Sequence, residues 1–277
     1  MKIDENTKII ARLHTKASPR GLNIYNPFFE EAHINALYVL FYNPDPTPLI
    51  AGLKNLNVVG AITAGFESNE LLPTLLDSVD EVGKYVGRIG FVKNVDGKLI
   101  GSTQGGEGLL RAIQNAGNIG GKKVVLVGGG NIAKGLLFNI NKLEQKPAEV
   151  VIINRDTLKI ETLKNDFDFV SSVKSISEIN SESGDVLINA TDIGGSVEDT
   201  VYTEEFVNKF SQIADVTFEK EETNLVTLAR KLNKNVSTGW DMFTFQGQVI
   251  LESILEIKID PVMLKKHVVR GLSEVVV

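Results

Sequence analysis

Apolar and polar residues alternate along this chain in short strand-like runs and longer helix-like stretches. In the first part, clustered apolar positions predict strands at Ile9–Leu13, Leu37–Tyr42 and Val58–Thr63. The intervening stretches predict helices at Tyr25–His33, Pro48–Leu56 and Asn69–Leu76. This order of elements indicates a sheet covered by helices.

A hairpin is predicted after these elements. The segments Arg88–Val92 and Lys98–Gly101 flank Asn94–Gly97, whose Asp-Gly pair favours a tight turn. A helix is expected at Glu107–Ala116. The loop Asn118–Lys122 is interpreted as part of a domain junction.

The second part restarts with Lys123–Val127, a continuous apolar run. Such a run is typical of a strand buried on both faces of a parallel sheet. Further strands are predicted at Val150–Ile153, Asp185–Asn189, Ile213–Thr217 and Asn235–Ser237. Helices are predicted at Asn131–Leu143, Leu225–Leu232, Met242–Ile254 and Pro261–Gly271. The βαβα order predicts an α/β fold with two domains and mainly parallel sheets.

A glycine-rich loop follows the strand Lys123–Val127 directly. It fits the pattern G-x-G-x-x-A and consists of Gly128, Gly129, Gly130, Asn131, Ile132 and Ala133. The first glycine allows a tight turn, the second lets the backbone approach a pyrophosphate, and Ala133 lets the helix pack on the strand. The helix N-terminus would offer N–H groups to the phosphates. The loop therefore predicts a dinucleotide site; the alternative is a glycine-rich turn used only for packing.

The residues after the next strand favour NADP as the cofactor. In sites that prefer NAD, an Asp or Glu here accepts a hydrogen bond from the ribose 2′-OH. This chain has Asn154 and Arg155 instead, and an arginine can pair with a 2′-phosphate. Lys159 could add a second cation, whereas Asp156 would repel the phosphate if its carboxylate pointed inward. The alternative is a solvated arginine at the start of a helix.

Composition excludes several other classes of function. The chain has 277 residues, with 43% hydrophobic and 23% charged residues, which is enough for two cores. Its net charge of −6 argues against a nucleic-acid surface, and the lack of cysteine excludes disulfides and thiolate chemistry. No signal peptide or membrane helix is expected, and the scattered histidines predict no metal site. We expect a cytoplasmic monomer or homodimer that acts on a small-molecule substrate.

The motifs of the second half resemble those of the shikimate/quinate dehydrogenase family. Besides Gly128–Ala133, the Asn154-Arg155 pair with Lys159 looks like the family's NADP clamp. The other matches are Ile188–Thr191, Asp215 with Thr223 (Phe218 replacing the family's tyrosine), and Gly239, Met242 and Gln246. The resemblance implies cofactor contacts by Thr191 and Gly239 and substrate contacts by Gln246 and Thr63.

The resemblance also implies a domain order. It predicts a substrate-binding α/β domain at 1–103 and a Rossmann NADP-binding domain at 104–240. Helices at 241–277 would then pack back on the first domain. The family's hairpin and domain-linking helix resemble Asp96–Gly101 and Gly108–Leu110.

The family's catalytic pair is missing. Glu67 stands where the family has its lysine, and Gly105 stands where it has its aspartate. Ile89-Gly90 aligns with the family's Asn-Thr, and its Ser-x-Ser motif has no clean counterpart within Lys16–Asn23. Oxidising an alcohol needs a base for its proton or a cation for the alkoxide, and glycine supplies neither. The catalytic residues therefore stay unknown.

Three functions remain open on these observations. The first is an NADP(H)-dependent oxidoreductase for a small hydroxy or keto compound, with weak or no activity on shikimate. The second is a non-catalytic protein that binds or senses NADP or a small acid. The third is a shikimate dehydrogenase with rearranged catalytic groups.

Overall fold

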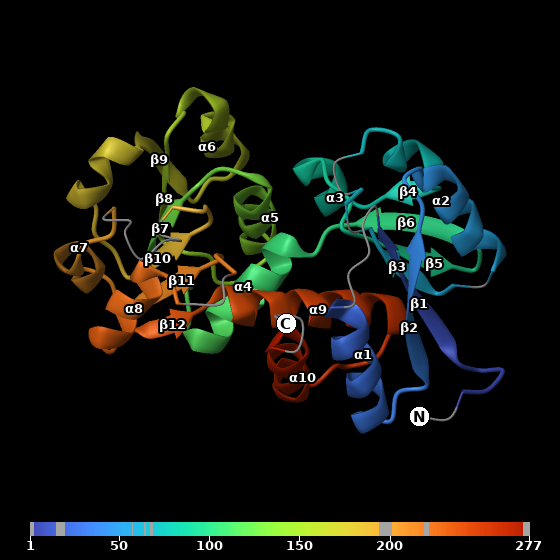
Figure 1. Cartoon of the computed structure of the whole chain (residues 1–277). Helices are drawn as coiled ribbons and strands as arrows, with labels where there is room; N and C mark the ends of the chain where they lie inside the picture. Colours follow the sequence, from blue (N-terminus) through green and yellow to red (C-terminus); the bar gives the residue numbers. More distant parts are fainter. Residues whose placement is uncertain are drawn as a thin grey trace. The chain divides into compact units, whose positions relative to one another are not determined.

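The computed structural model describes residues 3–14, 20–56, 58–63, 65–66, 69–193, 201–218 and 222–273. The chain divides into two compact units (Figure 1). The first unit comprises the residues up to Gln104 together with those from Gln246 onward. The second unit is Gly105–Phe245. The loop Asn118–Lys122, which we interpreted as part of a junction, lies inside the second unit.

The first unit is built on a mixed sheet with the strand order β2-β1-β3-β5-β6-β4. The strands are β1 (Lys8–His14), β2 (Ala36–Tyr42), β3 (Gly60–Ile62), β4 (Ser78–Val79), β5 (Phe91–Val95) and β6 (Lys98–Ser102). β1 pairs in parallel with β2 and β3, whereas β5 runs antiparallel to both β3 and β6. The predicted hairpin is confirmed, and its turn residues Asp96 and Gly97 have φ of 50° and 81°.

Helices cover both faces of this sheet. They are α1 (Arg20–Glu31), α2 (Pro46–Asn55), η1 (Leu72–Leu75), α3 (Glu81–Val86) and α10 (Pro261–Ser273). On one face, Ala11 and Leu13 of β1 join a core with Ile50 and Leu53 of α2. On the other face, α1 packs against β2 and α10. Helix α9 (Gly239–Leu255) begins in the second unit and contributes its residues from Gln246 onward to the first.

One prediction for this unit was wrong, and two short elements were not predicted. The stretch Asn69–Leu76 forms only the 3₁₀ turn η1, because Pro73 lacks the N–H group that a longer helix would need. β4 and α3 were not predicted, since a strand of two residues and a helix of six carry almost no periodic signal.

The second unit is built on a sheet whose described strands are all parallel, in the order β12-β11-β10-β7-β8-β9. The strands are β7 (Lys123–Val127), β8 (Glu149–Asn154), β9 (Val170–Ser175), β10 (Val186–Asn189), β11 (Gln212–Asp215) and β12 (Asn235–Ser237). From β7 the chain adds β8 and β9 on one side, and it then adds β10, β11 and β12 on the other side, so the strand order reverses between β7 and β10. This is the doubly wound Rossmann order, in which ligands bind at the carboxyl ends of the strands beside the reversal.

Helices of the second unit flank this sheet (Figure 1). They are α4 (Gly105–Ala116), α5 (Asn131–Ile140), η2 (Leu158–Ile160), α6 (Thr162–Asp166), η3 (Ile176–Ser181), α7 (Glu204–Asn208) and α8 (Asn224–Lys231). Val124–Val127 are fully buried, as the continuous apolar run predicted. Phe206 of α7, Leu225 of α8 and Phe210, which follows α7, belong to one buried core with residues of the strands. The predicted two-domain α/β fold class is therefore confirmed.

Candidate functional site

The glycine-rich loop begins at a residue that only glycine can occupy. Gly128 follows β7 with φ of +106°, and its N–H donates to the carbonyl oxygen of Ile153 at 2.8 Å. A Cβ here would lie 2.7 Å from Cγ2 of Thr191 and 2.9 Å from the carbonyl oxygen of Ala190. The backbone of the loop is therefore pressed against the end of β10 by a turn that side chains other than hydrogen would prevent.

The two following glycines have different surroundings. A Cβ at Gly129 would come within 2.3 Å of the Ile160 side chain, so this position is set by packing. A Cβ at Gly130 would meet nothing within 4 Å. Gly130 caps α5, where the first-turn N–H groups have no intrahelical acceptors. Open space over such a helix terminus suits an anionic group such as a pyrophosphate.

α5 is held in place by small residues on both sides. Ala133 is fully buried beneath the loop. A Cβ at Gly106 of α4 would lie 2.0 Å from the carbonyl carbon of Gly135 in α5, so these two helices meet backbone to backbone. The sequence pattern covered Ala133, but it missed this crossing. Gly135, in the middle of the predicted helix Asn131–Leu143, was the available signal, because glycine is unfavourable there without a packing reason.

The candidate ribose-phosphate residues lie at the carboxyl end of β8. Arg155 is exposed, and its guanidinium has no partner among the described residues. Lys159 pairs with Asp156, with 3.2 Å between Nζ and Oδ2, and the hydrogen bond from Lys159 lowers the pKa of Asp156 below its usual value. Asn154 donates from Nδ2 to the backbone oxygen of Asp156 at 2.8 Å and so shapes the turn.

A small pocket of about 70 Å³ opens beside these residues. Its wall combines the ends of β7, β8 and β10 and includes Val127, Asn154, Arg155, Thr191 and Asp192. It therefore lies at the carboxyl edge next to the reversal of strand order, where the fold places nucleotide sites. Ile132, also predicted to contact the cofactor, is half-buried in the first turn of α5.

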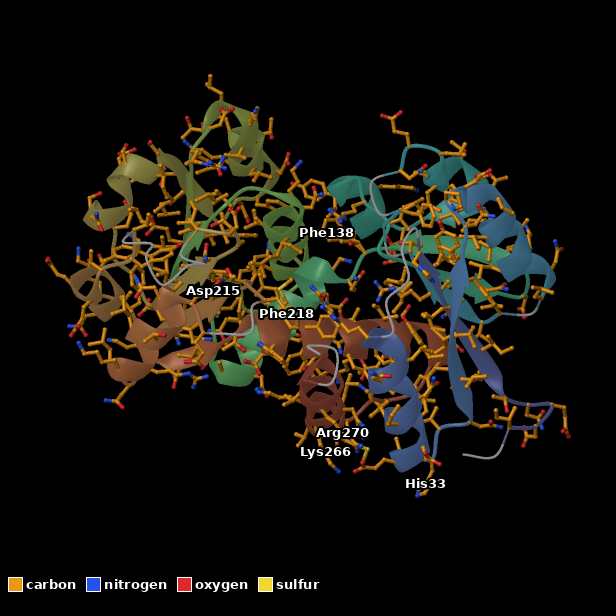
Figure 2. All side chains as sticks on the ribbon, in the orientation of Figure 1. His33, Phe138, Asp215, Phe218, Lys266 and Arg270 are labelled. Atoms are coloured by element: carbon orange, nitrogen blue, oxygen red, sulfur yellow. The ribbon has the colours of Figure 1, made fainter. Side chains whose placement is uncertain are left out.

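A buried polar network supports the end of β10. Asp215 of β11, labelled in Figure 2, is 1% exposed and accepts hydrogen bonds from Asn189 Nδ2 at 3.1 Å and Thr223 Oγ1 at 2.6 Å. Burial raises the pKa of Asp215, against these hydrogen bonds and that from Thr217 N–H, which lower it. Asn189 Oδ1 in turn accepts from the hydroxyl of Thr191 at 2.7 Å. The network orients Thr191, whose hydroxyl hydrogen is already used.

An aromatic cluster lies near the start of α9. Phe218, labelled in Figure 2, stacks on Phe243 with 5.2 Å between ring centroids and tilts against Trp240 at 5.1 Å. A Cβ at Gly239 would lie 2.2 Å from the carbonyl oxygen of Thr217. Gly239 thus holds the first turn of α9 against the loop that follows β11.

The candidate substrate residues lie in the first unit. Thr63 is fully buried; its hydroxyl donates to the carbonyl oxygen of Ile89 at 2.6 Å. Gln246 is half-buried on α9. Gly105 belongs to the second unit, where it begins α4 and carries no side chain. Glu67 and residues 16–19 of the stretch compared with Ser-x-Ser lie outside the described residues.

The described residues contain no group of three or more histidine, aspartate or glutamate side chains that could hold a metal ion. No helix in the described part of the chain has the length and apolar character needed to cross a bilayer.

Comparisons with known proteins agree with this geometry. Residues 111–218 match the family model for shikimate / quinate 5-dehydrogenases. The chain is 28% identical over 260 residues to a shikimate dehydrogenase (NADP(+)) of Geobacillus sp. (strain WCH70), covering 90% of this chain and 92% of that protein.

Two solved structures share the fold over nearly the full length of the chain. One is a shikimate dehydrogenase in complex with NADP+, with a TM-score of 0.80 and 23% identity, covering 97% of each chain. The other is the ligand-free form of a 5-ketofructose reductase of Gluconobacter sp. strain CHM43. It has a TM-score of 0.76 and 23% identity, and the match covers 96% of this chain and 99% of that one.

Proposed function

We propose that this chain, which belongs to the shikimate/quinate dehydrogenase family, binds NADP(H) through its second unit. Bound there, the nicotinamide would exchange a hydride with a small hydroxy or keto compound. The glycine-rich turn with open space over Gly130 supports a pyrophosphate site at the start of α5. The matched relative from Geobacillus, whose name specifies NADP(+), points to the same cofactor.

The cofactor proposal rests mainly on the exposed, unpaired guanidinium of Arg155 in the described part of the chain. Its guanidinium is exposed at the carboxyl end of β8, lines the pocket there, and has no partner among the described residues. A planar, permanently charged guanidinium matches a 2′-phosphate, which NADP has and NAD lacks. Asp156, the residue that could instead accept from a ribose 2′-OH, is engaged by Lys159. The pocket therefore favours the phosphorylated cofactor.

Titration of the purified protein with NADPH and NADH tests this proposal. We expect tighter binding of NADPH, and we expect Arg155→Ala to weaken NADPH by about 10- to 100-fold with little change for NADH. Arg230→Ala is the matched control, because Arg230 is an exposed cation of the same unit that pairs with Glu222. Equal affinities for the two cofactors in the wild type would contradict the proposal.

We propose further that shikimate is a poor substrate. In the family pattern a lysine and an aspartate handle the hydroxyl proton, and this chain has Glu67 and Gly105 at those positions. Gly105 offers neither a proton acceptor nor a charge. The same substitution favours a second candidate function, a protein that binds NADP and a small acid without turnover. A screen for NADPH oxidation over small ketones and keto acids distinguishes the two, since turnover of any of them excludes the non-catalytic candidate.

A further inference from the structure

A pocket of about 280 Å³ opens beside α3 in the first unit. It lies between residues 69–73, which include η1, and residues 79–89, which include α3, and we call it the α3 pocket. Pro73, Val79 and Ile89 give it an apolar wall. A concave site of roughly this size, with an apolar wall and a few polar groups, is the usual form of a site for a small molecule.

Charges of both signs line the α3 pocket. The carboxylate of Glu70 and the ammonium of Lys84 are exposed, and neither forms an ion pair or a side-chain hydrogen bond with any other residue that the structure describes. Arg88 adds a half-buried cation to the wall. Oδ1 of Asn69 accepts from the N–H of Leu71 at 2.9 Å, which fixes the amide at the rim. Opposite charges that line one pocket without meeting each other leave room between them for a ligand.

Two glycines shape the wall of the α3 pocket. Gly87 ends α3 with φ of +73°, and a Cβ there would meet nothing within 4 Å. Gly83 lies one turn earlier, where a Cβ would come within 2.7 Å of Val79 Cγ1. Helix α3 therefore presents backbone to the pocket, and the space over Gly87 is available to a ligand.

The α3 pocket and the predicted substrate residue Gln246 belong to opposite faces of the sheet. Ile89 is part of the core on the α2 side, together with Ala61 of β3. The neighbouring Gly60 points to the other face, where a Cβ would lie 2.7 Å from Ile254 of α9, the helix that carries Gln246. The pocket is therefore a site apart from the α9 face.

We propose that the α3 pocket binds a small zwitterion, namely an amino acid with an apolar side chain. The ammonium of the ligand would pair with Glu70 and its carboxylate with Lys84 and Arg88, while its side chain packs on the apolar wall. A phosphate group fits less well, because Glu70 would repel it. Charge pairs near solvent are weak, so we expect a dissociation constant of about 0.1–1 mM. This second ligand does not depend on the NADP proposal.

Leucine and two analogues that each lack one of its charges test the proposal. Isocaproate lacks the ammonium, and isoamylamine lacks the carboxylate, whereas both keep the apolar body. NMR titration of the full chain without any cofactor measures the three affinities, with phenylalanine as a second amino acid. We expect leucine to bind about three- to tenfold tighter than either analogue, because each analogue loses one charge pair.

Substitutions at the two exposed charges locate the ends of the ligand. Glu70→Gln should weaken leucine about three- to tenfold but should not weaken isocaproate, which has no ammonium. Lys84→Met should weaken leucine and isocaproate by the same factor and should not weaken isoamylamine. The matched controls are Glu81→Gln on α3 and Lys98→Met on β6, which remove exposed charges outside the pocket wall and should bind leucine as the wild type does.

Gly87→Asn tests the pocket without changing a charge. Asparagine tolerates a positive φ, so this variant should melt as the wild type does, while its side chain enters the open space and should abolish leucine binding. The proposal is overturned if neither leucine nor phenylalanine binds, or if isocaproate binds the wild type as tightly as leucine does. It is also overturned if all three pocket variants bind leucine normally, because the ligand then lies elsewhere. NADPH affinity of the variants should match the wild type, which keeps this result separate from the cofactor site.

Discussion

The carboxylate of Asp156 faces the ammonium of Lys159 across 3.2 Å, directly after Arg155, which lines the neighbouring pocket. The side chain of Lys159 is largely exposed and that of Asp156 is about half exposed, so the pair itself adds little stability. Its consequence concerns binding, because Asp156 neutralises a cation that would otherwise be available to a phosphate. Arg155 is left as the unpaired cation at this turn among the described residues.

Asp156→Asn should therefore increase the preference for NADPH. Removing the carboxylate frees Lys159 and takes a negative charge away from the 2′-phosphate, so NADPH should bind about two- to fivefold tighter, the scale of an exposed charge pair. NADH affinity should stay the same or fall. The gain should shrink in 0.5 M salt, because exposed charges are screened there. A gain in NADH affinity would show that Asp156 weakens binding of the ribose and not of the 2′-phosphate.

Gly128 and Gly130 provide a matched pair of substitutions in the loop. Gly128→Ala places a methyl group 2.7 Å from Thr191 at φ of +106°, so it should lower the unfolding free energy by more than about 1 kcal/mol and impair NADPH binding. Gly130→Ala meets nothing within 4 Å and has φ of −77°, so the protein should melt as the wild type does.

Gly128→Ala should weaken NADPH binding by distorting the loop, whereas Gly130→Ala should weaken it by occupying the space of the pyrophosphate. Gly130→Ala should still bind NADPH more weakly, because its methyl group enters the space over the start of α5. Thermal melting together with NADPH titration measures both effects. Unchanged NADPH affinity in a stable Gly130→Ala protein would contradict a pyrophosphate site at the start of α5.

Asp215 predicts a dependence of stability on pH. Its folded pKa is raised by burial above the ordinary 3.8, so the native state holds this proton more tightly than the unfolded state. The contribution of Asp215 to stability is fully present below its unfolded pKa and is lost as the pH rises through its folded pKa. Asp215→Asn, which cannot ionise, lacks this loss.

The melting temperature of Asp215→Asn relative to the wild type should therefore increase between pH 4 and pH 8. Asp215→Ala serves as the contrast, because it leaves the groups that donate from Asn189 and Thr223 without an acceptor and should destabilise at every pH. A difference between Asp215→Asn and the wild type that falls with rising pH would show that the hydrogen bonds to the carboxylate outweigh its burial.

The sequence was most informative where one local rule determines the structure. The run Lys123–Val127, the glycines after it and the Asp96-Gly97 turn each follow from backbone sterics or from burial on both faces, and the structure contains all three. The stretch around Pro73 has helical spacing but forms only a 3₁₀ turn, because the proline lacks the N–H that a longer helix needs.

Features that depend on tertiary contacts were beyond these rules. The pairing of Asp156 with Lys159 is a choice between side-chain orientations, which the spacing allows but does not require.

The last prediction concerns turnover of shikimate. Gly105 has no side chain to accept the hydroxyl proton. A Cβ at Gly90 would lie 2.0 Å from Oε1 of Gln104, so Gln104 fills the space that a side chain at 90 would need, and Ile89 is buried in the core. The wild type should therefore oxidise shikimate with NADP at least about 1000-fold more slowly than the typical enzyme rate of about 10 per second.

Glu67→Lys combined with Gly105→Asp should restore little of that activity, because Gln104 still occupies the space over Gly90. Adding Gly90→Thr and Gln104→Thr makes room for the polar contact that the family pattern has at position 90 and should raise turnover above that of the double variant. Steady-state rates with shikimate and NADP, with NADPH affinity measured on each variant as the control for folding, decide the matter. Turnover by the wild type near about 10 per second would show that another group has taken over proton removal, since glycine at 105 cannot perform it.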